Sequence, residues 1–454
     1  MKLIVKALAE INWGKRAHAI LVLCAMTVIA LPAQILTTVF GFESADGAHP
    51  YAGLVQATDG NLYGTTLGGG ASSVGTVFKI TAKGVLTTLY SFCSQSGCTD
   101  GESPYAGLIQ ATNGDFYGTT EYGGANDLPV GTIFKITSSG TLTTLHSFCS
   151  QGSFPYCTDG AEPQAGLVQA INGDLYGTTF RGGANGLGTI FKITPGGALT
   201  TLYAFCSQSG CTDGSNPVGG LIQAIDGNFY GATFGGGGEP TDSLGDGTIF
   251  KITPGGALTT LYSFCSLSGC TDGKYPEAGL IQGTDGDFYG TTSVGGVNGD
   301  GTVFRITPSG TLTTLYSFCS QSGCTDGLGS TAPLIQATNG DFYGPTYFGG
   351  DVNTCKLLDT YESGCGTLFR LSVGLGPFVK TLPTAGEVGE VVKILGTNLT
   401  GATSVSFNGT PAVFKVISSS LIATTVPAGT TSGSVHVVIP SGTLSSNVFF
   451  QVLP

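Results

Sequence analysis

The fold is decided by residues 106–148, which read AGLIQATNGDFYGTTEYGGANDLPVGTIFKITSSGTLTTLHSF. Runs rich in Thr, Ile, Phe, Leu and Tyr alternate with Thr-Asn-Gly, a longer glycine-rich segment and Ser-Ser-Gly. Such runs favour β-strands, and Asn-Gly is typical of a tight hairpin turn because glycine accepts a positive φ. The stretch therefore predicts four strands, at 106–111, 115–120, 131–137 and 141–148.

The same four-strand unit occurs six times in the chain. The segment GT(V/I/L)F(K/R) occupies 75–79, 131–135, 188–192, 247–251, 301–305 and 366–370. An LTT segment begins at 36, 86, 142, 199, 258 and 312. The spacing of 50 to 65 residues suits the four-stranded blades of a β-propeller. The coils of a β-solenoid are about half this length or less, which argues against that fold.

The first and last units are incomplete in a complementary way. The chain opens with a lone strand-like segment, ILTTVFGF at 35–42, and the last unit stops after GTLFRLS at 366–372. A strand supplied by 35–42 would complete the last sheet and leave no broken edge in the ring. We therefore predict an all-β fold, a six-bladed β-propeller over residues 35–373 that is closed by its N-terminal strand.

The direction of the strands alternates, so successive loops lie at opposite ends of the strands and therefore on opposite faces of the propeller. The turns after the first and third strands of each unit are short and share one face. The loops after the second and fourth strands are long and share the other, which we call the long-loop face. Function in such scaffolds concentrates on elaborated loops, so we expect the working surface there.

The N-terminus has the features of an export signal. An apolar run from Ala19 to Leu31 ends at Pro32-Ala33 and follows four basic residues, Lys2, Lys6, Lys15 and Arg16. This pattern predicts a signal peptide over residues 1–33, and an uncleaved membrane anchor is the alternative. The remaining chain carries 13 basic and 28 acidic residues, because the leader holds four of the 17 and one of the 29. A net charge of −15 argues against nucleic acid and anionic lipid as partners.

Twelve of the thirteen cysteines fall in close pairs: Cys93/Cys98, Cys149/Cys157, Cys206/Cys211, Cys265/Cys270, Cys319/Cys324 and Cys355/Cys365. An even number in an exported chain favours disulfides over thiolate metal sites, which usually use CxxC spacing together with histidine. Each bridge closes a loop of a few residues and should contribute about 2 kcal/mol. All six pairs lie in loops of the long-loop face.

The repeated GT-F-K, NGDFYGTT and LTTLYSF elements resemble those of the bacterial "choice-of-anchor tandem repeat GloVer-containing" proteins over residues 35–373. That resemblance implies export and a variable C-terminal attachment module, and it implies no activity. Residues 377–454 resemble an IPT/TIG domain, on ILGTNL (394–399), VSFNGTPA (405–412) and Val426-Pro427. This resemblance implies an immunoglobulin-like β-sandwich that acts as a spacer or interaction module.

Residues that recur in every unit are expected to build the fold. They form a Gln series (56, 110, 169, 223, 282, 336), a Tyr series (63, 117, 176, 230, 289, 343) and an Asp-Gly series (46, 100, 159, 213, 272, 326). We expect the Gln side chains to satisfy backbone groups near the first turns, with a polar channel lining as the alternative. We expect the tyrosines to pack between blades and the aspartates to form turns. A ring of aspartates that binds calcium is the alternative for the last series.

Unrepeated residues on the long-loop face are the better candidates for a site. The candidates for ligand binding are Glu102, Glu121, Glu162, Arg181, Glu277, Tyr105 and Tyr275. Further unrepeated side chains on this face are Asp127, Glu239, Asp242, Asp351, Lys356, Tyr122 and Tyr347. We predict no catalytic residue, metal or cofactor. Sialidase chemistry lacks its arginine cluster, and no GxSxG elbow accompanies the few histidines.

We therefore expect a monomeric binding protein that is secreted, periplasmic or displayed at the cell surface. Its ligand would be a glycan or an extracellular protein. The alternative is an extracellular glycosidase or lyase that acts on polysaccharide, because two of the unrepeated acids could serve as an acid/base pair.

Overall fold

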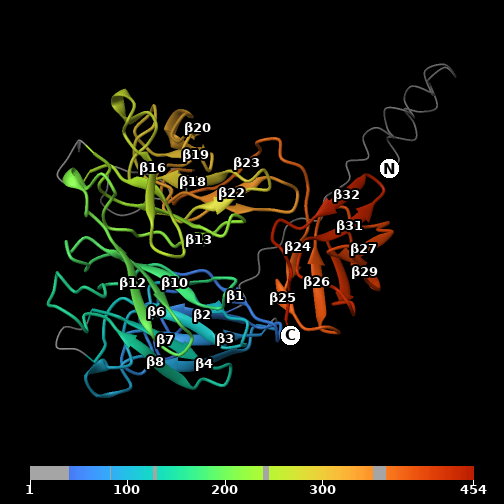
Figure 1. Cartoon of the computed structure of the whole chain (residues 1–454), viewed down its shortest axis with the longest axis horizontal. Coiled ribbons are helices and arrows are strands. Elements are labelled where there is room, and N and C mark those ends of the chain that lie inside the picture. Colours follow the sequence, from blue (N-terminus) through green and yellow to red (C-terminus); the bar gives the residue numbers. More distant parts are fainter. Residues whose placement is uncertain (1–39, 82, 126–129, 239–244, 351–364, 454) are drawn as a thin grey trace, which may run out of the picture. The chain divides into compact units, whose positions relative to one another are not determined.

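The computed structural model describes residues 40–81, 83–125, 130–238, 245–350 and 365–453. Within these ranges each repeat forms one antiparallel sheet whose strands follow chain order (Figure 1). Five of the sheets have four strands and the sixth, β21-β22-β23, has three. No helix among the described residues is both long and apolar enough to cross a membrane.

The strands occupy equivalent positions in the six units. The first strands are β1 (Val55–Gln56), β5 (Ile109–Gln110), β9 (Val168–Gln169), β13 (Ile222–Gln223), β17 (Ile281–Gln282) and β21 (Ile335–Gln336). The second strands are β2 (Leu62–Thr66), β6 (Phe116–Thr120), β10 (Leu175–Thr179), β14 (Phe229–Thr233), β18 (Phe288–Thr292) and β22 (Phe342–Pro345). The third strands are β3 (Thr76–Ile80), β7 (Thr132–Ile136), β11 (Thr189–Ile193), β15 (Thr248–Ile252), β19 (Thr302–Ile306) and β23 (Leu368–Leu371). The fourth strands are β4 (Leu86–Ser91), β8 (Leu142–Ser147), β12 (Leu199–Ala204), β16 (Leu258–Ser263) and β20 (Leu312–Ser317).

The first strand of each unit is shorter than the sequence predicts. In the second unit we expected strand over 106–111, and only Ile109 and Gln110 pair with β6. Glycine explains the difference, because Gly107 lies so close to the neighbouring unit that a Cβ would meet the Gly53 carbonyl oxygen at 2.9 Å. The innermost segments of adjacent units therefore contact each other backbone to backbone, and only their last two residues join the sheet.

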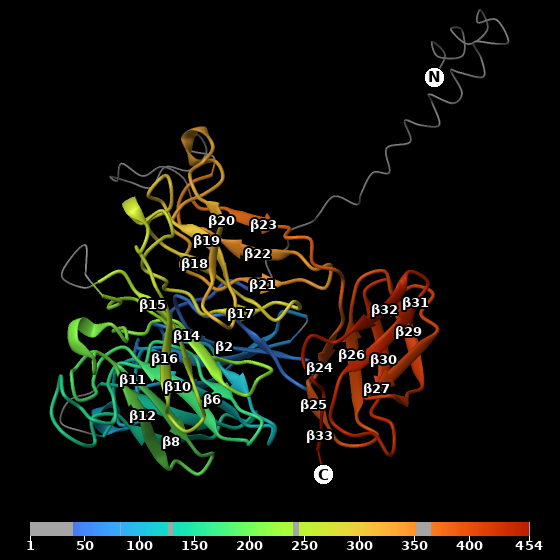
Figure 2. The same ribbon diagram turned by 45° about the horizontal axis from the view of Figure 1, so that its top comes forward.

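The hydrophobic core lies between the sheets. Each apolar cluster of the repeats combines residues from two consecutive units, as Phe205 of the third unit packs with Phe250 of the fourth. Their rings meet edge to face at 5.3 Å, and Tyr176 stacks on Phe229 at 4.1 Å between centroids. Five members of the Tyr series, Tyr63, Tyr117, Tyr176, Tyr230 and Tyr289, thus pack between consecutive sheets, as predicted. Figure 2 shows the same neighbourhood for β18–β20 of the fifth sheet beside β22 and β23 of the sixth.

The succession of sheets curves back on itself in the manner of a β-propeller. Burial raises the pKa of Tyr105 in the second unit, and the charge of Glu277 in the fifth unit adds to the rise, which agrees with such curvature. The edge of the sixth sheet is bare among the described residues, and Leu368 of β23 is 78% exposed. Residues 35–39, part of the segment predicted to cover this edge, lie outside the described residues, so closure of the ring stays a prediction.

Five of the predicted cysteine pairs are disulfides: Cys93–Cys98, Cys149–Cys157, Cys206–Cys211, Cys265–Cys270 and Cys319–Cys324. Cys365 is also disulfide-bonded, and Cys355, its predicted partner, lies outside the described residues. Four of the bridges contain a short 3-10 turn, at η1 (Ser96–Cys98), η2 (Ser209–Cys211), η3 (Ser268–Cys270) and η4 (Ser322–Cys324).

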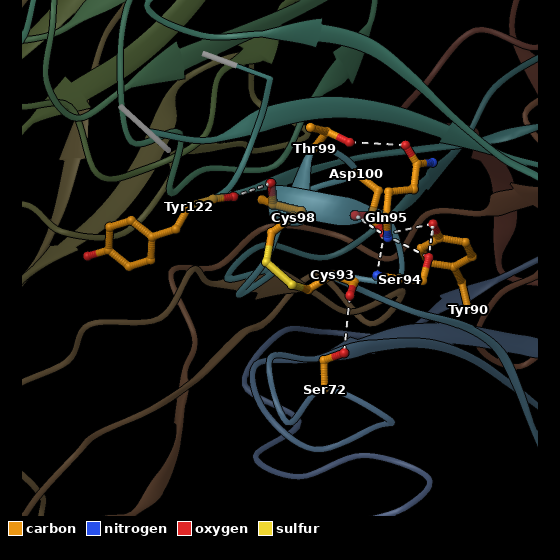
Figure 3. The surroundings of a disulfide bond; sticks show 10 residues. Ser72, Tyr90, Cys93, Ser94, Gln95, Cys98, Thr99, Asp100 and Tyr122 are labelled. Carbon is orange, nitrogen blue, oxygen red and sulfur yellow. Dashed lines mark hydrogen bonds between the residues drawn. A yellow bond between two sulfur atoms is a disulfide. The ribbon is translucent and has the colours of Figure 1, made fainter. Parts of the chain in front are cut away.

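An aspartate of the Asp-Gly series anchors each of these loops to the sheet (Figure 3). The Asp100 carboxylate accepts hydrogen bonds from the Tyr90 hydroxyl at 2.8 Å, from the Ser94 N–H at 2.9 Å and from the Gln95 N–H at 3.2 Å. The same bonds surround Asp213, Asp272 and Asp326. These four aspartates therefore organise their loops, as predicted, and both oxygens of each accept hydrogen bonds, which argues against the alternative of a calcium-binding ring.

The C-terminal residues form a β-sandwich of their own. One sheet contains β24 (Lys380–Leu382), β26 (Val391–Leu395), β30 (Leu421–Thr425) and β29 (Phe414–Ser418). The other contains β28 (Thr410–Pro411), β27 (Ser404–Phe407), β31 (Val435–Ile439) and β32 (Gly442–Ser445), and β25 (Ala385–Gly386) pairs in parallel with β33 (Gln451–Val452). Alternating residues such as Val435, Val437 and Ile439 fill its core.

Removing one ring from a contact between sheets should destabilise the protein strongly. We expect Phe205→Ala to lower the free energy of unfolding by about 3 to 5 kcal/mol, because a fully buried aromatic side chain leaves a cavity. Urea denaturation measures the change. The control is Ile225→Ala, which truncates a largely exposed side chain and should cost about 0.5 kcal/mol or less. Equal effects of the two substitutions would contradict this location of the core.

The tyrosines that bind the loop aspartates should resist ionisation. Burial raises the pKa of Tyr262 to about 12, and its hydrogen bond to Asp272 acts in the same direction. In the unfolded chain the pKa of a tyrosine is about 10. Because the folded protein raises this pKa, the neutral Tyr262 phenol contributes fully to stability below pH ~10, and this contribution is lost as the pH rises through ~12.

We therefore expect Tyr262→Phe to remove one late-titrating phenol and to flatten the fall of stability between pH ~10 and ~12. Ultraviolet titration of phenolate absorbance and denaturation across this range measure the two effects. Tyr156→Phe, at a largely exposed tyrosine, is the control and should leave the late phase unchanged. A late phase of the same amplitude in Tyr262→Phe would refute the assignment.

Candidate functional site

A strained residue starts each unit on the long-loop face. Six equivalent residues have a positive φ of 53° to 64°: His49, Ser103, Glu162, Asn216, Tyr275 and Gly329. Only the last is glycine, so the surroundings must hold the other five in place. For Glu162, the N–H donates to the Val130 carbonyl of the preceding unit at 2.7 Å, and the carbonyl accepts from the Phe180 N–H at 2.9 Å. The bond to the carbonyl recurs in the five other units and the bond from the N–H in four of them, so this corner of the backbone is fixed between neighbouring sheets.

The corner presents three side chains per unit, and we call these eighteen positions the rim. The first set is the strained residues themselves. The second set, two residues further along, is Tyr51, Tyr105, Gln164, Val218, Glu277 and Thr331. The third set follows the second strand and is Leu67, Glu121, Phe180, Phe234, Ser293 and Tyr347. The residue before each member of the third set is threonine in all six units, so a constant framework carries variable side chains.

Charged and polar rim residues of the second and third units interact directly. The Gln164 amide donates to Glu121 Oε1 at 2.9 Å, and the Arg181 Nε lies 3.2 Å from Glu162 Oε2. Glu121 is only 9% exposed. Burial raises the pKa of Glu162, the Arg181 guanidinium works against that rise, and the charge of Glu121 adds to it. The two carboxylates therefore act on each other inside one polar cluster.

Aromatic rings extend this cluster around the rim. Tyr51 and Tyr105 lie 4.5 Å apart between ring centroids, and Phe234 stacks on Tyr275 at 4.7 Å. Burial raises the pKa of Tyr105, as do its hydrogen bond with Tyr51 and the charges of Glu121 and Glu277. Burial also raises the pKa of Tyr122, together with the Glu121 carboxylate. The rim thus combines flat apolar surfaces with carboxylate acceptors.

The structure brings together five of the seven predicted binding residues. Arg181 pairs with Glu162, the charge of Glu121 contributes to the raised pKa values of Glu162 and Tyr105, and the charge of Glu277 contributes to that of Tyr105. Tyr275 belongs to the rim but stacks on Phe234, with the Lys274 ammonium 4.7 Å from its ring centroid. Glu102 lies instead beside the Cys93–Cys98 bridge. Asp127, Glu239, Asp242, Asp351 and Lys356 fall outside the described residues.

Sequence reasoning missed Tyr51, Gln164, Phe180 and Phe234 as site residues. All four occupy rim positions, so a comparison of the six units position by position would have found them. Residues that recur serve the framework. The Gln110 side chain accepts from the Thr58 N–H at 2.9 Å and donates to the Gly114 carbonyl at 3.2 Å, which ties the first turns of two units together. This is the expected role of the Gln series.

The fold and the loops define a disulfide-rich, β-propeller-like repeat protein. A family model described as the Gloeobacter/Verrucomicrobia repeat matches residues 27–212 and 207–410, and the IPT/TIG domain model matches residues 378–452. The chain therefore belongs to the Gloeobacter/Verrucomicrobia repeat family and ends in an IPT/TIG domain. No curated protein matches it in sequence.

Two similar solved structures have low identity to this chain. A luciferin-regenerating enzyme is 12% identical, with 73% of this chain and 94% of that chain covered and a TM-score of 0.41. An auxiliary nutrient binding protein from Bacteroides thetaiotaomicron is 15% identical, with coverages of 65% and 66% and a TM-score of 0.38. Neither likeness carries an argument about function.

The Arg181–Glu162 pair makes the electrostatics of the rim testable. We expect Arg181→Gln to raise the pKa of Glu162 further, because the guanidinium counteracts the effect of burial. NMR titration of the glutamate side-chain carbon resonances measures the shift. The control is Arg305→Gln, which removes an arginine that pairs with Asp287 instead. A Glu162 pKa that stays constant in Arg181→Gln would refute the pairing.

Proposed function

We propose that this chain is a non-catalytic binding protein whose rim recognises a neutral glycan. The observation that carries the proposal is the rim itself, where aromatic rings such as those of Tyr51, Tyr105 and Phe234 share one set of positions with the carboxylates of Glu121, Glu162 and Glu277. Flat rings offer apolar faces to the C–H surfaces of a sugar, and carboxylates accept hydrogen bonds from its hydroxyl groups.

The charge of the chain favours a neutral ligand over an acidic one. Among the described residues, the one ion pair of a rim carboxylate is that of Glu162 with Arg181, and the chain after residue 33 is strongly acidic. An anionic polymer would be repelled by this surface. A glycan without charge needs aromatic surface and acceptors, both of which the rim supplies.

A second candidate function has one specific observation in its favour. Glu162 has a raised pKa and lies within electrostatic reach of Glu121, as a general acid beside a second carboxylate would. A polysaccharide-active enzyme would use the pair as acid and base. We favour binding because Glu162 is paired with Arg181 and Glu121 accepts from Gln164, so both acids are held by protein partners.

We further propose that the protein is exported and that its ring is closed. Disulfides persist in oxidising compartments, which agrees with the predicted leader over residues 1–33. Phe42 meets Phe78 edge to face at 5.1 Å, the contact that Phe92 makes with Phe134 of the following unit. Phe42 thus occupies the place of a residue at the end of a fourth strand, which supports docking of residues 35–42 on β23.

Binding to a glycan array without turnover tests the function. With the best glycan, we expect Tyr105→Ala and Glu121→Gln each to weaken binding by about tenfold, since each removes one stacking face or acceptor worth about 1.4 kcal/mol. Isothermal titration measures the affinities. The control is Ile171→Ala, at an exposed side chain in the turn before β10, and it should bind as the wild type does.

Three outcomes would overturn the proposal. Release of reducing ends from the bound glycan, abolished by Glu162→Gln, would make the chain an enzyme. Capture of a defined extracellular protein by the rim, with no glycan bound, would make the partner a protein. Glycan binding that survives both rim substitutions would place the site elsewhere.

A further inference from the structure

Two features that do not recur in the repeats meet at one place beside the rim. The disulfide loop after β8 is longer than its counterparts, because Cys149 and Cys157 are eight residues apart and the paired cysteines of the other four described bridges are five apart. The third unit has the only arginine at the position of Arg181. The equivalent residues of the other units are Gly68, Tyr122, Gly235, Val294 and Phe348.

The longer loop of the second unit packs against the third unit. Its Phe154 side chain is partly buried against the apolar cluster that lies between the second and third sheets. The next residue, Pro155, approaches Gly186 in the loop between β10 and β11, where a Cβ on the glycine would lie 3.4 Å from the proline carbonyl oxygen. The extra residues of the loop are therefore held in place, and they carry an aromatic ring to the third unit.

The Arg181 guanidinium is held by two rings and one carboxylate. Its central carbon lies 5.8 Å from the ring centroid of Phe154 and 5.8 Å from that of Phe180. Its Nε lies 3.2 Å from Glu162 Oε2. Cations within about 6 Å of a ring centroid are attracted by the face of the ring, and the carboxylate adds a charge-assisted contact. One of these three partners, Phe154, comes from the longer loop.

The terminal Nη groups of Arg181 are available to a ligand. The side chain is 46% exposed, and its Nη atoms make no hydrogen bond to a described residue. Tyr122, at the equivalent position of the second unit, is 40% exposed. Burial and the charge of Glu121 raise the pKa of Tyr122, and Arg181 acts in the opposite direction, so the guanidinium is within electrostatic reach of this ring. Free N–H donors thus accompany an exposed ring and two carboxylates.

We propose that Phe154 positions Arg181 as a hydrogen-bond donor for hydroxyl groups of the glycan, an inference that rests on the proposed function. The rim carboxylates can only accept hydrogen bonds, whereas the hydroxyl oxygens of a sugar also need donors. The Gln164 amide already donates to Glu121. A planar guanidinium offers parallel N–H groups that match neighbouring oxygens, and a guanidinium that is already fixed loses little conformational freedom when the sugar binds.

The positioning role of Phe154 is tested without a ligand. Phe154→Leu keeps an apolar side chain on the cluster and removes the ring face, so we expect a less fixed guanidinium and a Glu162 pKa that rises toward its value in Arg181→Gln. NMR titration of the glutamate side-chain carbons measures the pKa. Phe154→Tyr keeps the ring and should leave the Glu162 pKa unchanged.

The matched control for this titration is Tyr156→Ala, which removes a largely exposed ring from the same loop and should also leave the Glu162 pKa unchanged. A Glu162 pKa in Phe154→Leu equal to that of the wild type would overturn the positioning role, because loss of the ring would then have no effect on Arg181.

Isothermal titration with cellohexaose, xylohexaose, mannohexaose and maltohexaose tests the donor role. For the sugar that binds most tightly, we expect Arg181→Gln to weaken binding about tenfold and Phe154→Leu about threefold. The double variant should bind no more weakly than Arg181→Gln, because Phe154 acts through Arg181. Tyr156→Ala is again the control and should bind as the wild type does.

The outcomes separate this inference from the proposed function. Undiminished binding by Arg181→Gln, with binding lost in Glu121→Gln, would overturn the donor role and leave glycan binding by the rim intact. Additive losses in the double variant would show that Phe154 contacts the sugar itself, which would contradict a positioning role. Failure of all four sugars to bind would overturn the donor role together with the proposed function, and the Glu162 pKa would still decide whether Phe154 positions Arg181.

Discussion

The contact between aromatic rings of neighbouring sheets is the interaction on which the rest of the structure depends. A phenylalanine just after the fourth strand of one unit meets the third-strand phenylalanine of the next at all five junctions between consecutive described sheets, as in Phe92–Phe134 and Phe264–Phe304. Because the apolar clusters bridge consecutive sheets, no sheet has a core of its own. Each sheet is therefore stable only when it packs against its neighbours, and the exposed faces of the first and last sheets must be covered by other residues.

Residues that maintain the packing between sheets recur in the units, whereas the residues of the candidate site vary from unit to unit. The aromatic contacts, the glutamine bridges between the short first turns and the aspartate-anchored disulfide loops of the long-loop face repeat in nearly every unit, so they form a constant framework. The rim positions are free to vary because they project from a backbone that is already fixed at both its N–H and its carbonyl. A repeated scaffold thereby acquires an asymmetric surface, with an aromatic rim residue in every unit and rim acids in the second, third and fifth units only.

The sequence predicted those features of the fold that depend on residues repeated in each unit. Strand order, the stapled loops and the packing role of the tyrosines follow from residues that recur, and each is present. The sequence predicted only part of the candidate site. Glu121, Glu162 and Arg181 were candidates because they are charged and do not recur in the other units. Gln164 was not a candidate, because its role comes from the hydrogen bond that it donates to Glu121. The role of Gln164 could not be predicted from its residue type, since it depends on how the folded backbone brings two consecutive units together.

A crystal structure of the exported chain, solved with the edge of β23 resolved, tests the account most directly. The account predicts that residues 36–41 pair antiparallel with β23, so that Leu368 is covered and the sixth sheet gains its fourth strand like the other five. A solvent-exposed β23 edge with residues 36–41 elsewhere would contradict it. The ring, and the common centre around which the rim is arranged, would then have to be abandoned.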